Sequence, residues 1–100
     1  MKRIEERLRA GETLVVDGAM GTMLQAAGLV PGECPELWCL EHADAVRAIH
    51  RQYRDAGSDV VETNSFGGTR YKLEHYGLGG RVSEINRAAA SLAREVAGDG

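Results

Sequence analysis

The sequence contains no apolar run that approaches the ~20 residues of a membrane-spanning helix. It has no surplus of positive charge either, because 12 Lys and Arg stand against 15 Asp and Glu and the formal net charge is −3. The chain begins with the basic Met1-Lys2-Arg3, but the apolar stretch of an export signal does not follow. These absences argue against a membrane or a nucleic acid as the partner and predict a cytoplasmic protein.

Cysteine is also scarce. Cys34 and Cys39 are the two cysteines of the chain. A zinc knuckle requires a second pair of ligands, and no CxxC or HxxxH pattern supplies one. Structural disulfides are rare in the cytosol. We therefore expect two unrelated thiols that pack or lie in a loop, and we assign neither of them to a metal site.

Short apolar segments alternate with segments of helical periodicity. Residues 13–16 and 58–63 are apolar and β-branched, which is typical of strands buried on both faces. Strand–loop–helix units of this kind predict an α/β fold with parallel strands. Apolar spacing and glycine stops predict helices over residues 3–10, 20–27, 43–56, 71–76 and 82–96, with residues 28–41 as the least regular loop.

Two parallel strands cannot cover both faces of a sheet or protect its edges. One interpretation is a small α/β domain with two paired strands. The interpretation that we favour is an N-terminal fragment of a (β/α)8 TIM barrel, with its first two strands and their helices. Closed barrels of eight strands typically need roughly 250 residues. Residues 1–100 would then be the N-terminal part of one barrel domain whose remaining strands lie beyond Gly100.

A glycine-flanked loop follows the first predicted strand, in the order Asp17, Gly18, Ala19, Met20, Gly21. Its glycines allow a tight turn, and backbone N–H groups at a helix N-terminus favour an anion. The carboxylate of Asp17 would hold a cation beside them. Acceptor and donors together suit a zwitterionic amino acid. A phosphate loop fits poorly, since the third glycine of the dinucleotide fingerprint and the Lys-Ser/Thr of a P-loop are missing. A purely structural turn stays open.

The loop after the second predicted strand concentrates neutral polar groups. Thr63, Asn64 and Ser65 can donate and accept hydrogen bonds, which suits the orientation of a substrate. An alternative is a hydrophilic turn in which Thr69 caps the next helix. Glu62 has an alternative role too, as an ion-pair partner of a neighbouring Arg or Lys.

The three histidines do not form a recognisable site. His50 lies on the apolar side of the helix predicted over residues 43–56, so packing or a helix-end contact is expected. His42 and His75 fall near helix ends, where solvated or capping roles are common. No Ser-His-Asp pattern or paired-carboxylate spacing is present.

Four stretches in register resemble the homocysteine S-methyltransferase family, especially the homocysteine-binding domain of cobalamin-dependent methionine synthase and, more distantly, betaine–homocysteine methyltransferase. They are residues 16–23, 49–53, 56–67 and 85–89. The stretches keep the order and nearly the spacing of the family across almost the whole chain, and residues 28–41 match least.

The resemblance implies a (β/α)8 barrel that transfers a methyl group to the thiol of L-homocysteine and so forms methionine. It implies that Asp17 receives the substrate ammonium, that the backbone from Gly18 to Gly21 receives the carboxylate, and that Thr63 and Asn64 line the same pocket. The substrate-binding residues that we predict are therefore Asp17, Gly18, Ala19, Met20, Gly21, Thr63 and Asn64.

In the family, three cysteine thiolates from later strands hold a zinc ion that keeps the homocysteine sulfur as a thiolate. Cys34 and Cys39 do not match those positions, so we predict no catalytic residue and no metal ligand in this chain. We expect a methyltransferase fragment that is inactive alone and depends on the remainder of the barrel. Cobalamin- and folate-binding modules are possible partners, and the methyl donor is not encoded here. The alternative is a free-standing, non-catalytic module that binds an amino acid or a protein.

Overall fold

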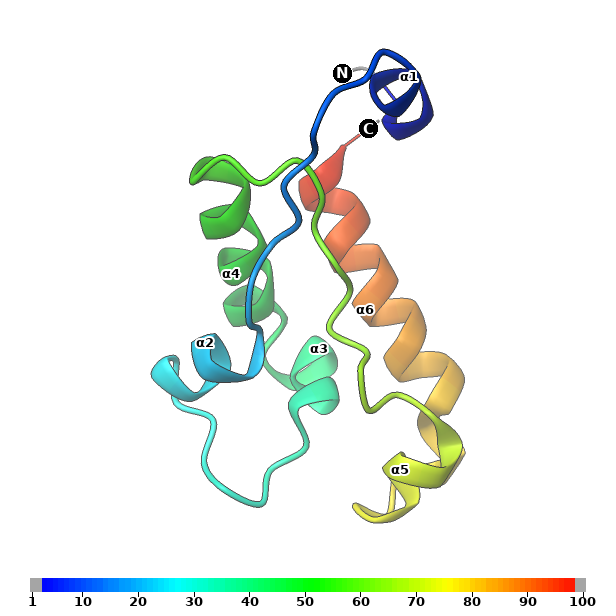
Figure 1. Cartoon of the computed structure of the whole chain (residues 1–100). Coiled ribbons are helices and arrows are strands. Elements are labelled where there is room, and N and C mark those ends of the chain that lie inside the picture. Colours follow the sequence, from blue (N-terminus) through cyan, green and yellow to red (C-terminus); the bar gives the residue numbers. More distant parts are fainter. Residues whose placement is uncertain (1–2, 99–100) are drawn as a thin grey trace.

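The computed structural model describes residues 3–98, and helices and extended segments make up the chain (Figure 1). Helices α4 and α6 are the longest, and six shorter helical elements surround them. In chain order the elements are α1 (Ile4–Arg9), α2 (Gly21–Ala26), the 3-10 helix η1 (Pro35–Leu37), α3 (Trp38–Glu41), α4 (Ala43–Asp55), α5 (Arg70–Glu74), the 3-10 helix η2 (Gly79–Arg81) and α6 (Val82–Ala97).

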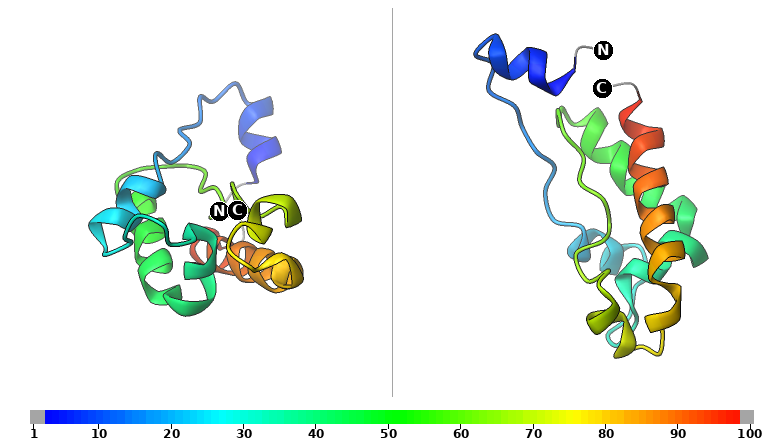
Figure 2. Two further views of the ribbon diagram at one scale, coloured as in Figure 1. Left: turned by 90° about the horizontal axis from the view of Figure 1, so that it is seen from below. Right: turned by 90° about the vertical axis from the view of Figure 1, so that its right-hand side faces the viewer.

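Two extended segments cover one side of α4 and α6, so that the molecule has a layer of extended chain and a layer of helices (Figure 2). The segments run parallel and meet at a single bridge between Val16 and Val60. The Val60 N–H donates to the carbonyl of Val15 at 3.1 Å, and the Asp17 N–H donates to the carbonyl of Val60 at 2.9 Å. The carboxyl ends of both segments therefore lie at the same edge.

The predicted strands over residues 13–16 and 58–63 are not formed as strands in the part of the chain that the structure describes. The direction of pairing is parallel, as expected, but its extent is one bridge. A two-stranded pair is marginal because each strand lacks a second neighbour to complete its hydrogen bonds. The (β/α)8 barrel stays a prediction, since it concerns strands that residues 3–98 do not include.

The helices α4 and α6 pack against each other because each has one apolar side. Val46 and Ile49 of α4 are buried, and so are Ile85, Ala89 and Leu92 of α6. Their bounds agree closely with the predicted helices over residues 43–56 and 82–96. The helix α6 ends before Gly98, whose φ of 69° is a conformation that glycine adopts at little cost. Helices α1 and α2 lie within the predicted ranges 3–10 and 20–27. The helix predicted over residues 71–76 is formed as α5, which spans residues 70–74.

The segment predicted to be an irregular loop, residues 28–41, is a large part of the core instead. It contains η1 and α3, and Trp38 and Cys39 are buried against Leu24, Val46 and Ile49. Glycine and proline interrupt the apolar spacing of this segment, so that its periodicity is too short to read. Pro35 has the fixed φ that suits the first position of η1.

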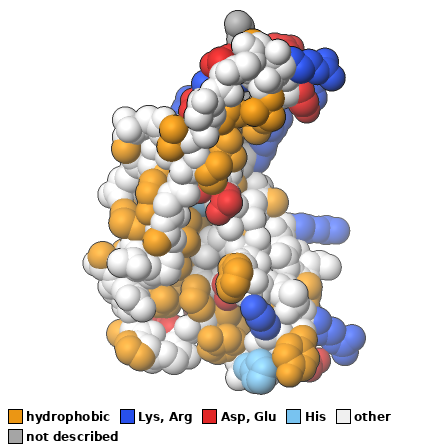
Figure 3. Space-filling view, in the orientation of Figure 1, with side chains coloured by type: hydrophobic (Ala, Val, Ile, Leu, Met, Phe, Trp, Pro, Cys, Tyr) orange, Lys and Arg blue, Asp and Glu red, His pale blue; other side chains and the backbone are white. Residues whose placement is uncertain are grey.

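The first extended segment carries exposed apolar side chains. Val15 and Val16 are 55% and 49% exposed, and hydrophobic atoms follow this segment in the space-filling view (Figure 3). Arg7 of α1 forms an ion pair with Asp59, at 2.8 Å, and so fastens α1 to the second extended segment. Within residues 3–98, no helix has the length and apolar character needed to cross a membrane.

Candidate functional site

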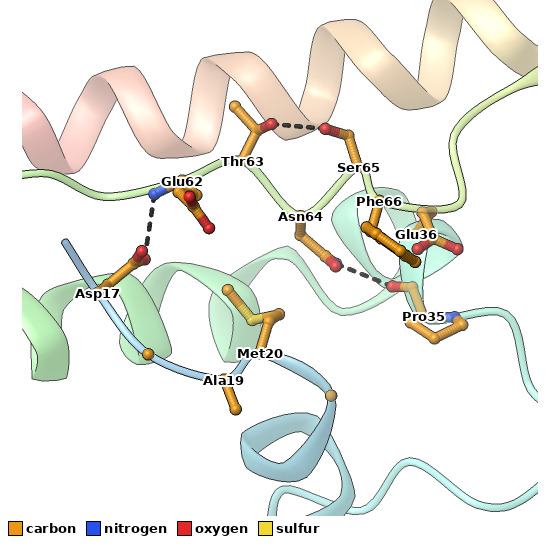
Figure 4. Close-up of a pocket in the computed structure, with 12 residues that line it drawn as sticks. Asp17, Ala19, Met20, Pro35, Glu36, Glu62, Thr63, Asn64, Ser65 and Phe66 are labelled. Carbon is orange, nitrogen blue, oxygen red and sulfur yellow. Dashed lines mark hydrogen bonds between the residues drawn. The ribbon is translucent and has the colours of Figure 1, made fainter.

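A cavity of about 350 Å³ lies where the two extended segments end (Figure 4). The loop after the first segment forms one wall, the loop after the second forms another, and η1 closes one end. All seven residues that the sequence singled out line this cavity. The complete lining is Asp17, Gly18, Ala19, Met20, Gly21, Pro35, Glu36, Glu62, Thr63, Asn64, Ser65 and Phe66.

Asp17 joins the two loops. Its carboxylate oxygen Oδ2 accepts a hydrogen bond from the backbone N–H of Glu62, at 3.1 Å. The other oxygen, Oδ1, is buried and has no hydrogen-bond partner in the structure. The side chain as a whole is half-buried and lines the cavity. Asp17 therefore offers a carboxylate that a backbone donor fixes in place, as a site for a cation requires.

The helix α4 packs against the first loop through Tyr53. The hydroxyl of Tyr53 donates to the carbonyl of Ala19 at 2.6 Å. A Cβ atom at Gly18 would lie 3.1 Å from that hydroxyl oxygen, so a larger residue would push the loop away from the helix. A Cβ at Gly21 would meet nothing within 4 Å. The two glycines thus differ: the structure needs Gly18 for close approach and does not need Gly21.

The amide side chain of Asn64 anchors the second loop. Asn64 is buried, and its Nδ2 donates to the carbonyl of Pro35 at 2.9 Å and to Sγ of Cys39 at 3.4 Å. The hydroxyls of Thr63 and Ser65 are exposed and lie 2.5 Å apart. Asn64 was predicted as a pocket residue, and it lines the pocket, but its donor group faces η1 and α3 and is engaged there.

Thr69 has the capping role that the alternative interpretation gave it. Its hydroxyl accepts a hydrogen bond from the backbone N–H of Lys72, at 3.2 Å, at the start of α5. This loop therefore serves two purposes: residues up to Phe66 line the cavity, and Thr69 caps the next helix.

Glu36 is a residue of the cavity that sequence reasoning missed. It is 6% exposed, its Oε2 accepts from the Gly67 N–H at 3.1 Å, and its Oε1 lies 3.5 Å from Sγ of Cys34. In the close-up it lies beside Phe66, at the end of the cavity away from Asp17 (Figure 4). Its neighbours in the sequence gave no signal, because its placement depends on the packing of η1 against the second loop.

His50 is a buried polar residue that does not line the cavity but lies near Asp17. It lies on α4, is fully buried, and so packs as predicted. Neither ring nitrogen has a hydrogen-bond partner in the structure. Burial lowers the pKa of His50, and the nearby carboxylate of Asp17 opposes that shift. The ring is therefore neutral near pH 7.

The two cysteines do not fit the zinc ion that the resemblance implies. Cys34 and Cys39 are buried free thiols. Burial raises the pKa of both, that of Cys39 to about 11, so each stays protonated at neutral pH and is a poor metal ligand. Across residues 3–98, no group of three or more His, Cys, Asp or Glu side chains has an arrangement that could hold a metal ion. We derive no chemical step through zinc from these residues.

Comparison with known proteins adds a family. The sequence profile described as homocysteine S-methyltransferase matches residues 14–100. The chain is 39% identical over 90 residues to methionine synthase from Mycobacterium tuberculosis, and the matched region covers 84% of this chain and 8% of the relative. It is 42% identical over 99 residues to betaine–homocysteine S-methyltransferase 1 from Danio rerio, and the matched region covers 95% of this chain and 24% of the relative.

A third relative is the S-methylmethionine–homocysteine S-methyltransferase of Pongo abelii, 38% identical over 101 residues, or 97% of this chain and 26% of the relative. The chain thus spans about a quarter or less of the length of these three curated relatives. The identities of 39% and 42% do not place it nearer to methionine synthase than to the betaine enzyme. The motifs suggested a closer likeness to methionine synthase, and the two identities do not separate these relatives.

Proposed function

The chain belongs to the homocysteine S-methyltransferase family, and on that premise we propose that it binds L-homocysteine in the cavity between its two loops. The observation that carries the proposal is the carboxylate of Asp17, which a backbone donor fixes at the cavity wall. An ionised carboxylate in this position suits the ammonium group of an amino acid. A cavity of about 350 Å³ also suits a small ligand.

The remaining contacts would orient the rest of the amino acid. Asp17 retains acceptor capacity at Oδ2 for the ammonium group. Of the hydrogen-bonded hydroxyls of Thr63 and Ser65, the one that accepts from the other keeps its proton and can donate to the carboxylate, together with backbone N–H groups of the loop from Gly18 to Gly21. Because α2 has six residues, its dipole is a small part of this interaction. Glu36 gives the other end of the cavity a second carboxylate.

We also propose that the extended pair is the first part of a (β/α)8 barrel. The segments run parallel, helices α4 and α6 cover one face, and Val15 and Val16 of the first segment are exposed. Parallel sheets normally have both faces covered. Further strands, contributed by the rest of the barrel, would bury these valines and pair the free edges.

Activation of the homocysteine sulfur belongs, in this proposal, to groups outside residues 3–98. The two thiols of the described chain are buried and protonated, and none of its side-chain clusters suits a metal ion. Zinc, and cobalamin or folate modules if the protein uses them, would act there. The relatives are named for different methyl donors, betaine and S-methylmethionine among them. In this proposal, the rest of each enzyme selects the donor.

Titration calorimetry with three ligands tests the binding proposal. L-homocysteine should bind the 100-residue chain, and its des-amino analogue should bind about 10-fold more weakly or worse, because the hydrogen bond to a charged acceptor is lost. The loss of affinity for the decarboxylated analogue measures, in the same way, how much the contacts to the carboxylate contribute. Failure of homocysteine itself to bind, with the chain folded by circular dichroism, would overturn the proposal.

A second candidate is a non-catalytic module that binds an amino acid or a protein partner. The cavity between the two loops would serve such a module as well, since binding needs no metal ion. Incubation with homocysteine, zinc and one of three donors (betaine, S-methylmethionine or methylcobalamin), followed by mass spectrometry for methionine, separates the two. The product of the complete reading frame should form methionine if the family activity is retained. Binding without methionine from any donor would support the module instead.

A further inference from the structure

The first loop rests on two side chains of one helix face. Tyr53 of α4 donates to the carbonyl of Ala19 and lies against Gly18. His50 precedes Tyr53 by three residues, so the two side chains lie on the same side of the helix, one turn apart. Since Tyr53 contacts the residues that follow Asp17, this face of α4 brings His50 beneath the start of the loop.

Three buried polar atoms at this place lack a hydrogen-bond partner. In the described part of the chain, buried side-chain N and O atoms without a partner occur on two residues, as Oδ1 of Asp17 and as both ring nitrogens of His50. Native proteins rarely leave such atoms unpaired, and each case calls for an explanation. Asp17 and His50 are also electrostatic neighbours. A partner shared by Oδ1 of Asp17 and one ring nitrogen of His50 would account for two of these three atoms.

The chemistry of the two groups is complementary. A neutral imidazole has one N–H donor and one acceptor nitrogen. The carboxylate of Asp17 is an acceptor at Oδ1, and its Oδ2 already accepts from Glu62. One buried water between a ring N–H and Oδ1 would pair both, as buried waters commonly do between polar groups. A leucine at position 50 would fill a similar space without any polar atom to pair.

We propose that His50 is a positioning residue for Asp17: through one buried water its ring N–H holds Oδ1 on the side of α4, and so Oδ2 is presented to the ammonium group of the substrate. This inference rests on the proposed function, because it assigns a supporting role at the same site. The imidazole itself is fully buried and does not touch the substrate. It acts through the orientation of the carboxylate.

Substitutions at position 50 separate a hydrogen-bonding role from a packing role. His50→Leu keeps the volume and removes the donor, whereas His50→Asn and His50→Gln place an amide N–H near the two ring-nitrogen positions. We expect His50→Leu to weaken homocysteine binding by about 10-fold and to leave the affinity for the des-amino analogue unchanged. One of the two amide variants should recover most of the lost affinity for homocysteine.

Val46→Ala is the matched control, because Val46 is a fully buried residue of the same helix. It should lower the thermal unfolding midpoint and leave the ratio of the two affinities as in the wild type. Equal losses of affinity for homocysteine and for the des-amino analogue in His50→Leu, which leave the ratio of the two affinities as in the wild type, would overturn the inference. If the wild type does not bind homocysteine, the proposed function itself fails. If the wild type binds and the ratio is unchanged in His50→Leu, only the role of His50 fails.

A measurement on the wild-type side chain covers the case in which His50→Leu does not fold. The ¹⁵N chemical shifts of the His50 ring report which nitrogen carries the proton and whether it is hydrogen bonded. We expect one fixed neutral tautomer, and a shift of the protonated nitrogen in Asp17→Asn and on addition of homocysteine. Ring shifts that are insensitive to both changes would contradict the coupling of His50 to Asp17.

Discussion

The two loops that line the cavity are held by different means. The first loop is anchored through its backbone, since the carbonyl of Ala19 accepts from Tyr53, and its charged side chain lines the cavity. The second loop is anchored through a side chain, since Asn64 donates to Pro35 and Cys39. The Asp17 carboxylate accepts one hydrogen bond, from the Glu62 N–H, and retains acceptor capacity for a ligand. A loop anchored by a side chain has that group engaged already.

The difference bears on which substitutions affect binding and which affect folding. Changes at Asp17 should act mainly on ligand affinity. Changes at Asn64 should act mainly on stability, although both residues line the same cavity. Four measurements test this division, and they follow from the largest expected effect to the smallest.

Asp17→Asn should lower the affinity for L-homocysteine by about 10- to 100-fold, because an ammonium group loses an ionised acceptor. The amide oxygen can still accept from the Glu62 N–H, so the unfolding midpoint should change little. Calorimetry and thermal unfolding of the same samples give both values. Glu36→Gln is the comparison at the other end of the cavity and should have a smaller effect on affinity. Unchanged affinity in Asp17→Asn would remove Asp17 from the site.

Asn64→Ala should destabilise the fold by about 1–3 kcal/mol, because it removes two hydrogen bonds and leaves the Pro35 carbonyl without this donor. Urea unfolding measures the loss. Thr63→Val removes the neighbouring, exposed hydroxyl and should change stability by no more than about 0.5 kcal/mol. Equal stability of these two variants would show that the second loop is not anchored by its amide.

Gly18→Ala should cost about 1–2 kcal/mol, since the added Cβ would lie 3.1 Å from the hydroxyl oxygen of Tyr53. Gly21→Ala should be neutral or stabilise by less than about 1 kcal/mol, because a Cβ there meets nothing within 4 Å and alanine favours the helix. Chemical unfolding of the two variants side by side gives the difference. Equal effects would mean that Tyr53 does not press on the first loop.

Stability should also fall with mild acid, as the smallest of the four effects. The pKa of His50 is lower in the folded chain than its ordinary value, so the unfolded chain binds the proton more tightly. The resulting stability is complete above about pH 6.5 and is lost as the pH falls below this value toward the folded pKa. His50→Gln should flatten the change in unfolding free energy between about pH 7.5 and 5.5. An identical pH profile for the two proteins would place the titration elsewhere.

Much of the site could be predicted because it depends on local order. The glycines around Asp17 and the polar run from Thr63 follow apolar segments directly, so their positions near one edge were readable from the sequence. Glu36 was not readable. It lies in residues 28–41, where the spacing of glycine and proline hides η1 and α3, and it reaches the cavity through a hydrogen bond to Gly67, 31 positions away.

The extent of strand pairing was beyond the reach of the sequence for a different reason. Residues 13–16 and 58–63 have strand composition, but hydrogen bonds between strands need neighbours on both sides. In residues 3–98 each segment has one neighbour, so the pairing stops at the Val16–Val60 bridge. Local preference chose the extended conformation, and the absence of a third strand among these residues limited the ladder.

The sequence by itself determined the helices α4 and α6, the parallel course of the two extended segments and the family to which the chain belongs. These properties depend on short-range spacing and on residue identity. Only the tertiary structure decided that Asn64 anchors while Asp17 remains at the cavity wall, and that Glu36 and His50 lie beside them. Burial and hydrogen-bond partners are set by contacts between segments far apart in the chain, and no local pattern encodes those contacts.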